Sequence, residues 1–199
     1  MQNLVLATHN EGKAKEIKNV LHDLPFKIVT LNQLENVPEV EEDGATFREN
    51  ALKKARTISN FTQEISLADD SGLVIDSLDG LPGVKSARFA GEDASDSDNN
   101  LLLMEKLEGI PEYERKARFV CVLALAYPEG GEDIIEETCE GIILTQQRGS
   151  SGFGYDPLFY HEPTGLTFAQ MDPELKNRVS HRGKALQQLR PLMEKLIFK

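Results

Sequence analysis

Residues 117–144 read ARFVCVLALAYPEGGEDIIEETCEGIIL and carry the strongest strand signal in the chain. The segment from Ala117 to Tyr127 is almost continuously apolar, which is typical of a buried strand. Pro128-Glu129-Gly130-Gly131 is a turn sequence, and a second strand is expected from about Ile134 to Leu144. We therefore predict a long antiparallel hairpin.

Strand and helix signals continue on both sides of this hairpin. Strands are expected from Asn3 to Thr8 and from Ile65 to Asp69, where the second strand ends at an acidic pair. Apolar spacing and N-terminal capping signals predict helices over 13–24, 46–59, 95–107, a short segment from 172, and 183–196. The apolar residues of 101–107 are expected to lie in the core. Together these signals favour an α/β or α+β architecture around a mixed sheet, and we predict an α/β fold with a mixed central sheet and flanking helices.

Length and composition limit the class of protein. The 199 residues are 40% hydrophobic and contain no internal repeat, so we expect residues 1–199 to form a single domain. No apolar stretch approaches the length of a membrane helix, and Met1-Gln2-Asn3 lacks a basic signal-peptide region, which predicts a cytoplasmic protein without membrane contact. Cys121 and Cys139 lack C-x-x-C spacing and are expected to be reduced packing residues.

The net charge of −11 argues against binding of long nucleic acids, because such binding depends on many contacts between cations and phosphates. A small anionic ligand remains compatible with the charge if local cations converge on it. The candidate cations are Lys13, Lys54, Lys176 and Arg182.

Two adjacent carboxylates stand in residues 67–73, LADDSGL. Because like charges side by side repel one another, Asp69 and Asp70 call for a compensating cation, and Mg²⁺ prefers such oxygen ligands. An upstream acidic cluster could supply another ligand; it consists of Glu39, Glu41, Glu42 and Asp43. The local alternative is a solvated turn.

Residues 8–13, THNEGK, join the first predicted strand to the first predicted helix, where free backbone N–H groups favour an anion such as phosphate. The segment is not a Walker A loop, because Ala7 and Ala14 replace its first glycine and its hydroxyl residue. Asp70-Ser71-Gly72 matches the D-[ST]-G triplet of aspartic proteases, but the chain has no second copy to complete the required pair of carboxylates.

A glycine-rich loop and a helix start supply further candidates. In residues 150–157, SSGFGYDP, aromatic rings could stack on a nucleobase and Asp156 could accept from a base N–H, although a packed turn with Phe153 in the core is the local alternative. In residues 180–183, SHRG, His181 and Arg182 could donate to carbonyl oxygens of a ligand, and a helix cap is the alternative there.

Five motifs in order resemble the inosine triphosphate pyrophosphatase family, also called the Ham1 family of non-canonical purine nucleoside triphosphate pyrophosphatases. The motifs are Thr8-His9-Asn10-x-x-Lys13, EEDGATFRENA over 41–51, ADDSGL over 68–73, GFGYDP over 152–157 and SHRG over 180–183. The resemblance spans nearly the whole chain. One departure is Ser151, which stands where many members of the family have glycine.

The resemblance implies a Mg²⁺-dependent homodimer that hydrolyses ITP, dITP and XTP to the monophosphate and pyrophosphate, with two lobes around a nucleotide-binding cleft. It implies that Asp70 is the proton acceptor for the attacking water, and that Glu41 and Asp70 bind the metal. The phosphate-binding residues implied are Thr8, His9, Asn10, Glu11, Gly12 and Lys13. The remaining nucleotide contacts implied are Ser71, Phe153, Gly154, Tyr155, Asp156, Lys176, His181 and Arg182.

Several alternatives stay open at this point. Glu41 is preferred to Glu42 only by motif alignment, and Asp69 could raise the basicity of Asp70 or hold a second metal ion. Arg182 or His181 could select a 6-oxopurine over adenine, whereas the rejection of guanine has no assigned residue. A Maf-type pyrophosphatase for other nucleotides and a nucleotide-sensing domain without hydrolysis are the rival functions.

Overall fold

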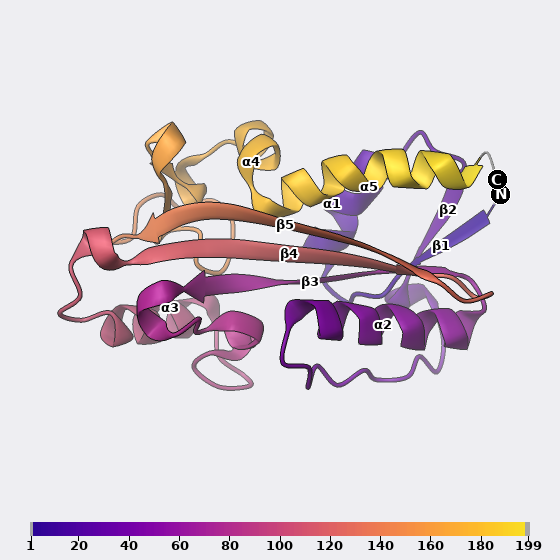
Figure 1. The fold of residues 1–199 in the computed structure, drawn as a ribbon, viewed down its shortest axis with the longest axis horizontal. Helices are drawn as coiled ribbons and strands as arrows, with labels where there is room; N and C mark the ends of the chain where they lie inside the picture. The colour runs from indigo at the N-terminus through magenta and orange to yellow at the C-terminus, as the bar shows by residue number, and fades with distance from the viewer. Residues whose placement is uncertain (1, 198–199) are drawn as a thin grey trace. The chain divides into compact units, whose positions relative to one another are not determined.

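The computed structural model describes residues 2–197. Its seven strands form one sheet in the order β2-β1-β3-β4-β5-β6-β7 (Figure 1). Parallel pairing joins β1 to β2 and β3, and antiparallel pairing joins β6 to β5 and β7, so the sheet is mixed as predicted. The strands are β1 (Gln2–Leu6), β2 (Phe26–Thr30), β3 (Ile65–Ile75), β4 (Lys116–Ala126), β5 (Glu132–Ile143), β6 (Phe159–His161) and β7 (Leu166–Thr167).

The α-helices agree with the predicted segments to within a few residues. They are α1 (Glu11–Leu21), α2 (Phe47–Thr62), α3 (Asp96–Lys106), α4 (Pro173–Val179) and α5 (His181–Ile197). Short 3₁₀ helices are η1 (Leu31–Gln33), η2 (Asp76–Leu78), η3 (Gly83–Arg88), η4 (Glu112–Glu114), η5 (Glu162–Thr164) and η6 (Phe168–Gln170). Capping boxes at Thr46 and Ser95 start α2 and α3, and the predicted hairpin is present as β4 and β5.

The chain divides into two compact units, and several chain segments contribute to each. Unit 1 comprises Met1–Asp70, Cys121–Glu136 and Ala185–Lys199, and unit 2 comprises Ser71–Val120 and Glu137–Lys184. Each unit has its own hydrophobic core. That residues 1–199 form a single domain stays a prediction.

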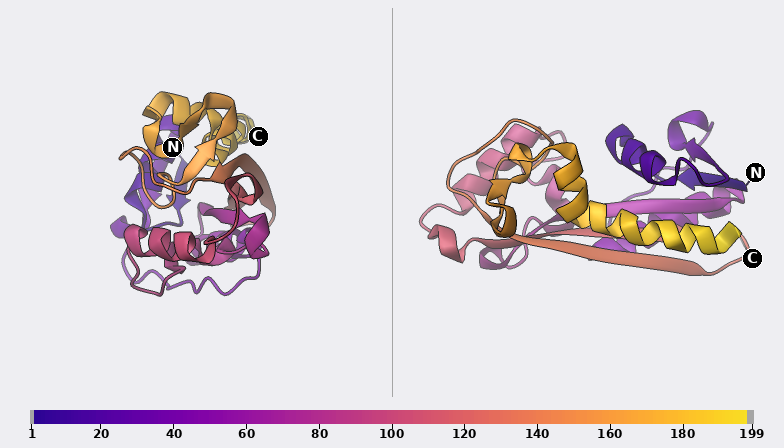
Figure 2. Two further views of the ribbon diagram at one scale, coloured as in Figure 1. Left: turned by 90° about the vertical axis from the view of Figure 1, so that its left-hand side faces the viewer. Right: turned by 90° about the horizontal axis from the view of Figure 1, so that it is seen from above.

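In unit 1, helices cover both faces of the strands. Figure 1 shows α1 and α5 on one side and α2 on the other. On the first side, Ile17 and Leu189 belong to one buried cluster with Leu4, Leu67 and alternate residues of β4. In the right-hand view of Figure 2, α5 (yellow) lies beside α1 (indigo), and Arg190 of α5 donates to the carbonyl oxygen of Val20 at 2.9 Å. Burial on both faces explains why β4 is apolar at almost every position.

In unit 2, the core is built around aromatic rings. Phe119 of β4 packs against Phe159 and Phe168 with ring centroids 4.7 and 5.6 Å apart. Leu103 of α3 and Leu107, the C-cap residue of that helix, are fully buried in the same cluster. The prediction that the whole apolar stretch of α3 is core was wrong at one position, because Leu101 is 63% exposed on the outer side of the helix.

The predicted end of the strand that starts at Ile65, which is β3, was also wrong. We expected the strand to stop at Asp69, whereas β3 continues through the acidic pair to Ile75. Its pattern of burial shows the reason: the residues of β3 on either side of the pair are buried, and β4 runs alongside as its neighbour in the sheet. The acidic pair therefore lies within a strand and is not the start of a loop.

Candidate active site

The carboxylates of Asp69 and Asp70 lie on opposite faces of β3. Successive side chains of a strand alternate between its faces, and each carboxylate meets a lysine from a different helix. Asp69 pairs with Lys13 of α1, and Asp70 pairs with Lys54 of α2. Since the two residues are only 2% and 6% exposed, the alternative of a solvated turn is wrong. The alternation also separates the carboxylates, so Asp69 does not face a cation bound by Asp70.

Asp69 forms a buried ion pair with the first turn of α1. Lys13 Nζ donates to Asp69 Oδ1, and the thiol of Cys121 on β4 donates to Asp69 Oδ2 at 3.4 Å. The carboxylate of Asp69 is fully enclosed, whereas part of the Lys13 side chain remains open to solvent. The pair therefore fixes an ammonium group near the N-terminal end of α1.

Asp70 belongs to a second, separate ion cluster on the α2 side of β3. Lys54 Nζ donates to Asp70 Oδ1 at 2.9 Å, to Glu42 Oε1 at 2.7 Å and to the carbonyl oxygen of Asp69 at 2.9 Å. Burial raises the pKa of Asp70, and the Lys54 charge offsets only part of that effect, so the pKa stays above its usual value. A carboxylate with a raised pKa is a stronger base than an exposed one.

The second oxygen of Asp70 is available for a further partner. Asp70 Oδ2 is buried and accepts no hydrogen bond within the described residues. A buried carboxylate oxygen without a partner is costly, and a cation or a water molecule would satisfy it. Within residues 2–197 no three His, Cys, Asp or Glu side chains group as a metal cage. This donor set fits Mg²⁺, which typically uses one or two carboxylates together with substrate phosphates.

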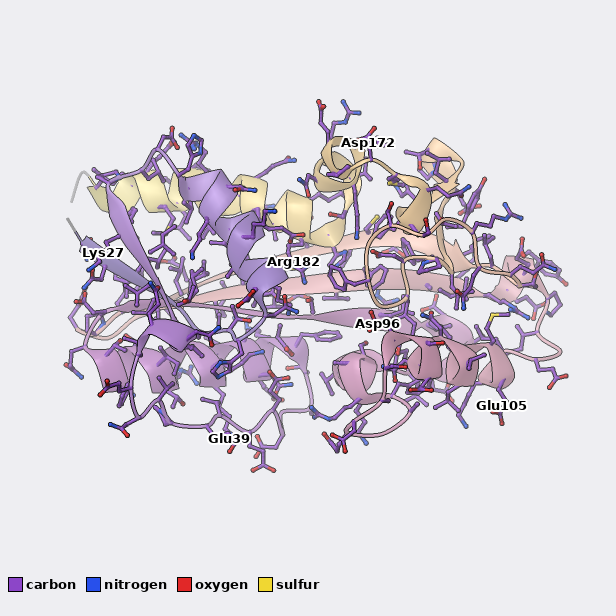
Figure 3. All side chains as sticks on the ribbon, turned by 180° about the vertical axis from the view of Figure 1, so that it is seen from behind. Lys27, Glu39, Asp96, Glu105, Asp172 and Arg182 are labelled. Carbon is purple, nitrogen blue, oxygen red and sulfur yellow. The ribbon has the colours of Figure 1, made fainter. Side chains whose placement is uncertain are left out.

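The acidic segment before α2 is held in place by Asn50. The side chain of Asn50 accepts from the backbone N–H of Gly44 at 2.8 Å, and the capping box of Thr46 and Glu49 fixes the next turn. Within this segment, Glu42 reaches Lys54, whereas Glu41 is exposed. Figure 3 shows Glu39 on the loop outside α2, and its side chain is exposed as well. The structure thus brings Glu42 to the charge cluster of Asp70.

A pocket of about 630 Å³ lies where β1 leads into α1. Its wall includes Thr8, His9, Asn10, Glu11 and Gly12, together with residues of α1 and of the segment 30–33. Asn10 is the N-cap of α1, where its side chain accepts from the backbone N–H of Lys13. The remaining free N–H groups of a helix start favour an anion. The predicted phosphate-binding segment thus faces an open pocket, while the side chain of Lys13 turns to Asp69.

In unit 2, the glycine-rich loop presents an exposed aromatic ring. Phe153 is 51% exposed, so the alternative that places it in the core is wrong. Lys176 Nζ lies 5.0 Å from the ring centroid and the guanidinium of Arg182 lies 5.9 Å from it. Asp156 pairs with Lys176 and accepts from the backbone N–H of Phe153 at 2.9 Å. Two predicted cations and a predicted carboxylate therefore surround the exposed ring.

Gly152 leaves the space that the carboxylate of Asp156 occupies in this loop. A Cβ atom added there would stand 1.9 Å from Asp156 Oδ2, and the residue has a φ of +81°, which L side chains rarely adopt. Asp156 needs that space to reach both Phe153 and Lys176. The glycine therefore has a steric as well as a conformational role.

Tyr155 and His181 are packed rather than exposed. Tyr155 is 4% exposed, and its hydroxyl donates to the carbonyl oxygen of Ser86 at 2.9 Å. The ring of His181 stacks on Phe119 with centroids 4.7 Å apart. Tyr155 thus anchors the loop to the core, and His181 anchors the start of α5.

Arg182 and Ser71, which are far apart in the sequence, meet in unit 2. Arg182 Nη2 donates to the hydroxyl oxygen of Ser71 at 2.8 Å. The next residue, Gly183, is in close contact with α4, since an added Cβ would lie 1.8 Å from the carbonyl oxygen of Asn177. This close approach fixes the position from which Arg182 extends.

The predicted site residues fall into two sets. Thr8 to Lys13, Glu41 and Asp70 belong to unit 1, and the other set, from Ser71 to Arg182, belongs to unit 2. Sequence reasoning assigned no role to Asn50, Asp96 and Asn100, which help to hold these sets in place. It named Lys54 as a candidate cation for an anionic ligand and Glu42 as a candidate metal ligand, and it did not predict that these two pair with each other. Asn50 stands within a quoted motif, whereas Asp96 and Asn100 lie outside all of them, and their partner Gly154 is distant in sequence.

Comparison with known proteins supports one family. A family model described as the Ham1 family matches residues 4–192. A dITP/XTP pyrophosphatase of Desulforamulus reducens is 50% identical over 97% of this chain and 96% of the relative. A dITP/XTP pyrophosphatase of Geobacter sulfurreducens is 52% identical over 94% of each chain.

Solved structures show the same fold. A HAM1 protein from Coxiella burnetii has a TM-score of 0.92 and 41% identity, covering 98% of this chain and 100% of its own. A nucleoside-triphosphatase described as a dITP/XTP pyrophosphatase from Mycobacterium abscessus has a TM-score of 0.81 and 40% identity, covering 96% of this chain and 100% of its own. The predicted mixed α/β architecture is confirmed.

Proposed function

The chain belongs to the Ham1 family, and on that premise we propose that it hydrolyses ITP, dITP and XTP to the monophosphate and pyrophosphate. This activity would remove deaminated purines from the nucleotide pool. The substrate class is supported by dITP/XTP pyrophosphatases that share about half of their residues with this chain over nearly its full length. The observation that carries the chemistry is Asp70, a buried carboxylate of raised pKa with one unpartnered oxygen.

The residues of unit 1 are assigned to the triphosphate. Thr8 to Gly12 bind phosphate oxygens through the N-terminal end of α1, and Lys13 adds a fixed positive charge. Glu41 and Asp70 bind Mg²⁺, with Glu42 held beside Asp70 by Lys54. When bound, the metal neutralises phosphate oxygens and makes the attacking water more acidic.

Asp70 is the proton acceptor in this proposal. A water molecule attacks the α-phosphorus, the bond from that phosphorus to the bridging oxygen of the β-phosphate breaks, and pyrophosphate leaves. The proton lost by the water passes to a carboxylate oxygen of Asp70. Burial makes this carboxylate more basic, while Lys54 fixes its other oxygen at 2.9 Å.

The residues of unit 2 are assigned to contacts with the nucleotide's base. Phe153 stacks on the base, and Arg182 or His181 donates to the 6-oxo group of hypoxanthine or xanthine. Adenine carries an amino group at that position and would leave a buried donor unpaired, which disfavours ATP. The other residues assigned to the nucleotide are Ser71, Gly154, Tyr155, Asp156 and Lys176.

We also propose which metal the enzyme uses, its oligomeric state and its location in the cell. We infer Mg²⁺ as the metal because hard carboxylate and phosphate oxygens match its preference. We also propose a homodimer, and the cytoplasm as the location, since free nucleotides are the substrate. Within residues 2–197 no helix combines the length and apolar character needed to cross a membrane.

A nucleotide panel tests this function directly. Purified protein is incubated with ITP, XTP, GTP and ATP, with and without Mg²⁺, and both pyrophosphate and monophosphate are measured. We expect rapid release from ITP and XTP that depends on Mg²⁺ and is slow for ATP. A preference for pyrimidine or other modified triphosphates would instead support the Maf-type alternative.

A second experiment separates hydrolysis from binding. Asp70→Asn should abolish turnover while ITP binding, followed by calorimetry, persists. Binding without turnover in the unmodified protein would favour a nucleotide sensor. An unchanged rate in Asp70→Asn would rule out the proton-acceptor role.

A further inference from the structure

The N-terminal end of α3 holds both polar groups of one glycine in the aromatic loop. Asp96 Oδ2 accepts from the backbone N–H of Gly154 at 2.6 Å, and Asn100 Nδ2 donates to the carbonyl oxygen of Gly154 at 2.8 Å. Figure 3 labels Asp96 at this end of α3, below the loop. Asn100 is buried and also donates to the carbonyl oxygen of Asp96, so the two holding residues are linked to each other.

The clamped glycine lies directly after the exposed ring of Phe153. The backbone N–H of Phe153 itself donates to Asp156. Gly152, the residue directly before Phe153, adopts a positive φ. Gly154 also has a positive φ, of +59°. Glycine has a large conformational freedom, so a ring between two glycines keeps one direction only if its backbone is fixed by other contacts.

We propose that Asp96 and Asn100 are positioning residues that fix the Phe153 ring for stacking on the purine base. This inference rests on the proposed function. Both residues would act on the ring through the backbone of Gly154, since one accepts from its N–H and the other donates to its carbonyl oxygen. A ring that is already held in its binding direction loses less entropy on binding, and the affinity is higher for that reason.

The charge of Asp96 matters less than its acceptor oxygen. A carboxylate forms a stronger bond to a backbone N–H than a neutral group does, but Asn also offers an oxygen acceptor at the same distance from the backbone. We call the two hydrogen bonds that hold Gly154 the clamp. Asp96→Asn should retain much of the bond from the Gly154 N–H, whereas Asp96→Ala should lose it and keep only the bond from Asn100. Asp96 is exposed, so neither substitution leaves a cavity in the core.

Asp98 provides a matched control in the same helical turn. Its side chain accepts from the N–H and hydroxyl groups of Ser95 and completes the capping box of α3, with no contact to Gly154. Asp98→Ala should weaken the start of α3, because the variant loses a capping interaction. A loss caused only by weakening α3 would therefore appear in this variant too.

Steady-state kinetics with ITP give the first test. Because stacking contributes equally to the bound substrate and the transition state, its loss raises KM and leaves kcat nearly unchanged. We expect Asp96→Ala to raise KM about five- to tenfold, in line with the loss of one charge-assisted hydrogen bond. Asp96→Asn should recover most of that loss, and Asp98→Ala should leave KM unchanged. Equal KM values for Asp96→Ala and the unmodified enzyme would overturn the proposal.

A fluorescence measurement tests the clamp without any turnover. The chain contains no tryptophan, so Phe153→Trp places a single reporter on the loop. Adding Asp96→Ala should lower the anisotropy of this tryptophan, whereas adding Asp98→Ala should not. An anisotropy that stays constant would contradict the positioning role. If the protein hydrolysed no triphosphate but showed the expected anisotropy change, the proposed function would be refuted. The conclusion that Asp96 fixes the ring at position 153 would still stand.

Discussion

Asp69 and Asp70 are adjacent in the chain, yet each carboxylate is paired with a lysine from a different helix. Lys13 of α1 meets Asp69, and Lys54 of α2 meets Asp70. The two pairs lie on opposite faces of β3, so one strand carries two independent buried ion pairs. This arrangement separates the carboxylate that holds Lys13, the cation assigned to phosphate binding, from the carboxylate assigned to proton transfer.

Removing the cation beside Asp70 should destabilise the protein. Lys54→Met leaves the buried carboxylate of Asp70 and the half-buried carboxylate of Glu42 without their shared ammonium group. Breaking the buried pair with Asp70 in this way costs about 3 kcal/mol. Urea unfolding of the metal-free protein measures the change. The double variant Lys54→Met/Asp70→Asn should be more stable than Lys54→Met alone, because one uncompensated charge is gone. Strictly additive effects would show that the two side chains do not interact.

The ion pair of Asp69 should matter for function through Lys13. Asp69→Asn keeps the shape of the side chain but removes the charge that holds the ammonium group, and we expect kcat/KM for ITP to fall about tenfold. The exposed pair of Asp43 and Lys53, also in unit 1, supplies the control. Asp43→Asn should leave kcat/KM within a factor of about two, since exposed pairs contribute little. Similar losses in both variants would contradict a specific role for Asp69.

Two glycines of the aromatic loop should differ in their tolerance of alanine. Gly152→Ala places a Cβ 1.9 Å from Asp156 Oδ2 and should displace that carboxylate, with a loss of most activity. Gly154→Ala meets nothing within 4 Å and should cost about 1 kcal/mol for its positive φ. ITP kinetics and thermal unfolding measure the two effects. Equal activity in the two variants would show that Asp156 does not need its present position.

Both thiols should resist alkylation in the folded protein at neutral pH. Cys121 and Cys139 are both buried and are not joined by a disulfide, as the sequence predicted. Burial raises the pKa of Cys139 from 9.0 to about 11, so its reactive thiolate forms only as the pH approaches that value. Mass spectrometry after iodoacetamide treatment should find neither cysteine labelled in the folded protein and both labelled in guanidinium chloride. Rapid labelling of Cys139 at neutral pH would contradict its buried environment.

Local features of the fold could be predicted because their interactions span only a few residues. The capping boxes of Thr46 with Glu49 and of Ser95 with Asp98 each form between residues three apart, and both helices start where these signals stand. The hairpin was predictable for a similar reason, since a short turn joins two strands. The end of β3 was not predictable, because the strand continues beside β4, which is distant in sequence.

By itself, the sequence determined the family resemblance, the alternation of strands and helices, and the residue types assigned to the site. Only the tertiary structure decided which groups meet: Lys54 with both Asp70 and Glu42, Lys13 with Asp69, and the backbone N–H of Gly154 with Asp96. The physical reason lies in the range of the interactions. Caps and turns depend on neighbours along the chain, whereas the partner of a buried charge depends on which helix packs against which face of the strand.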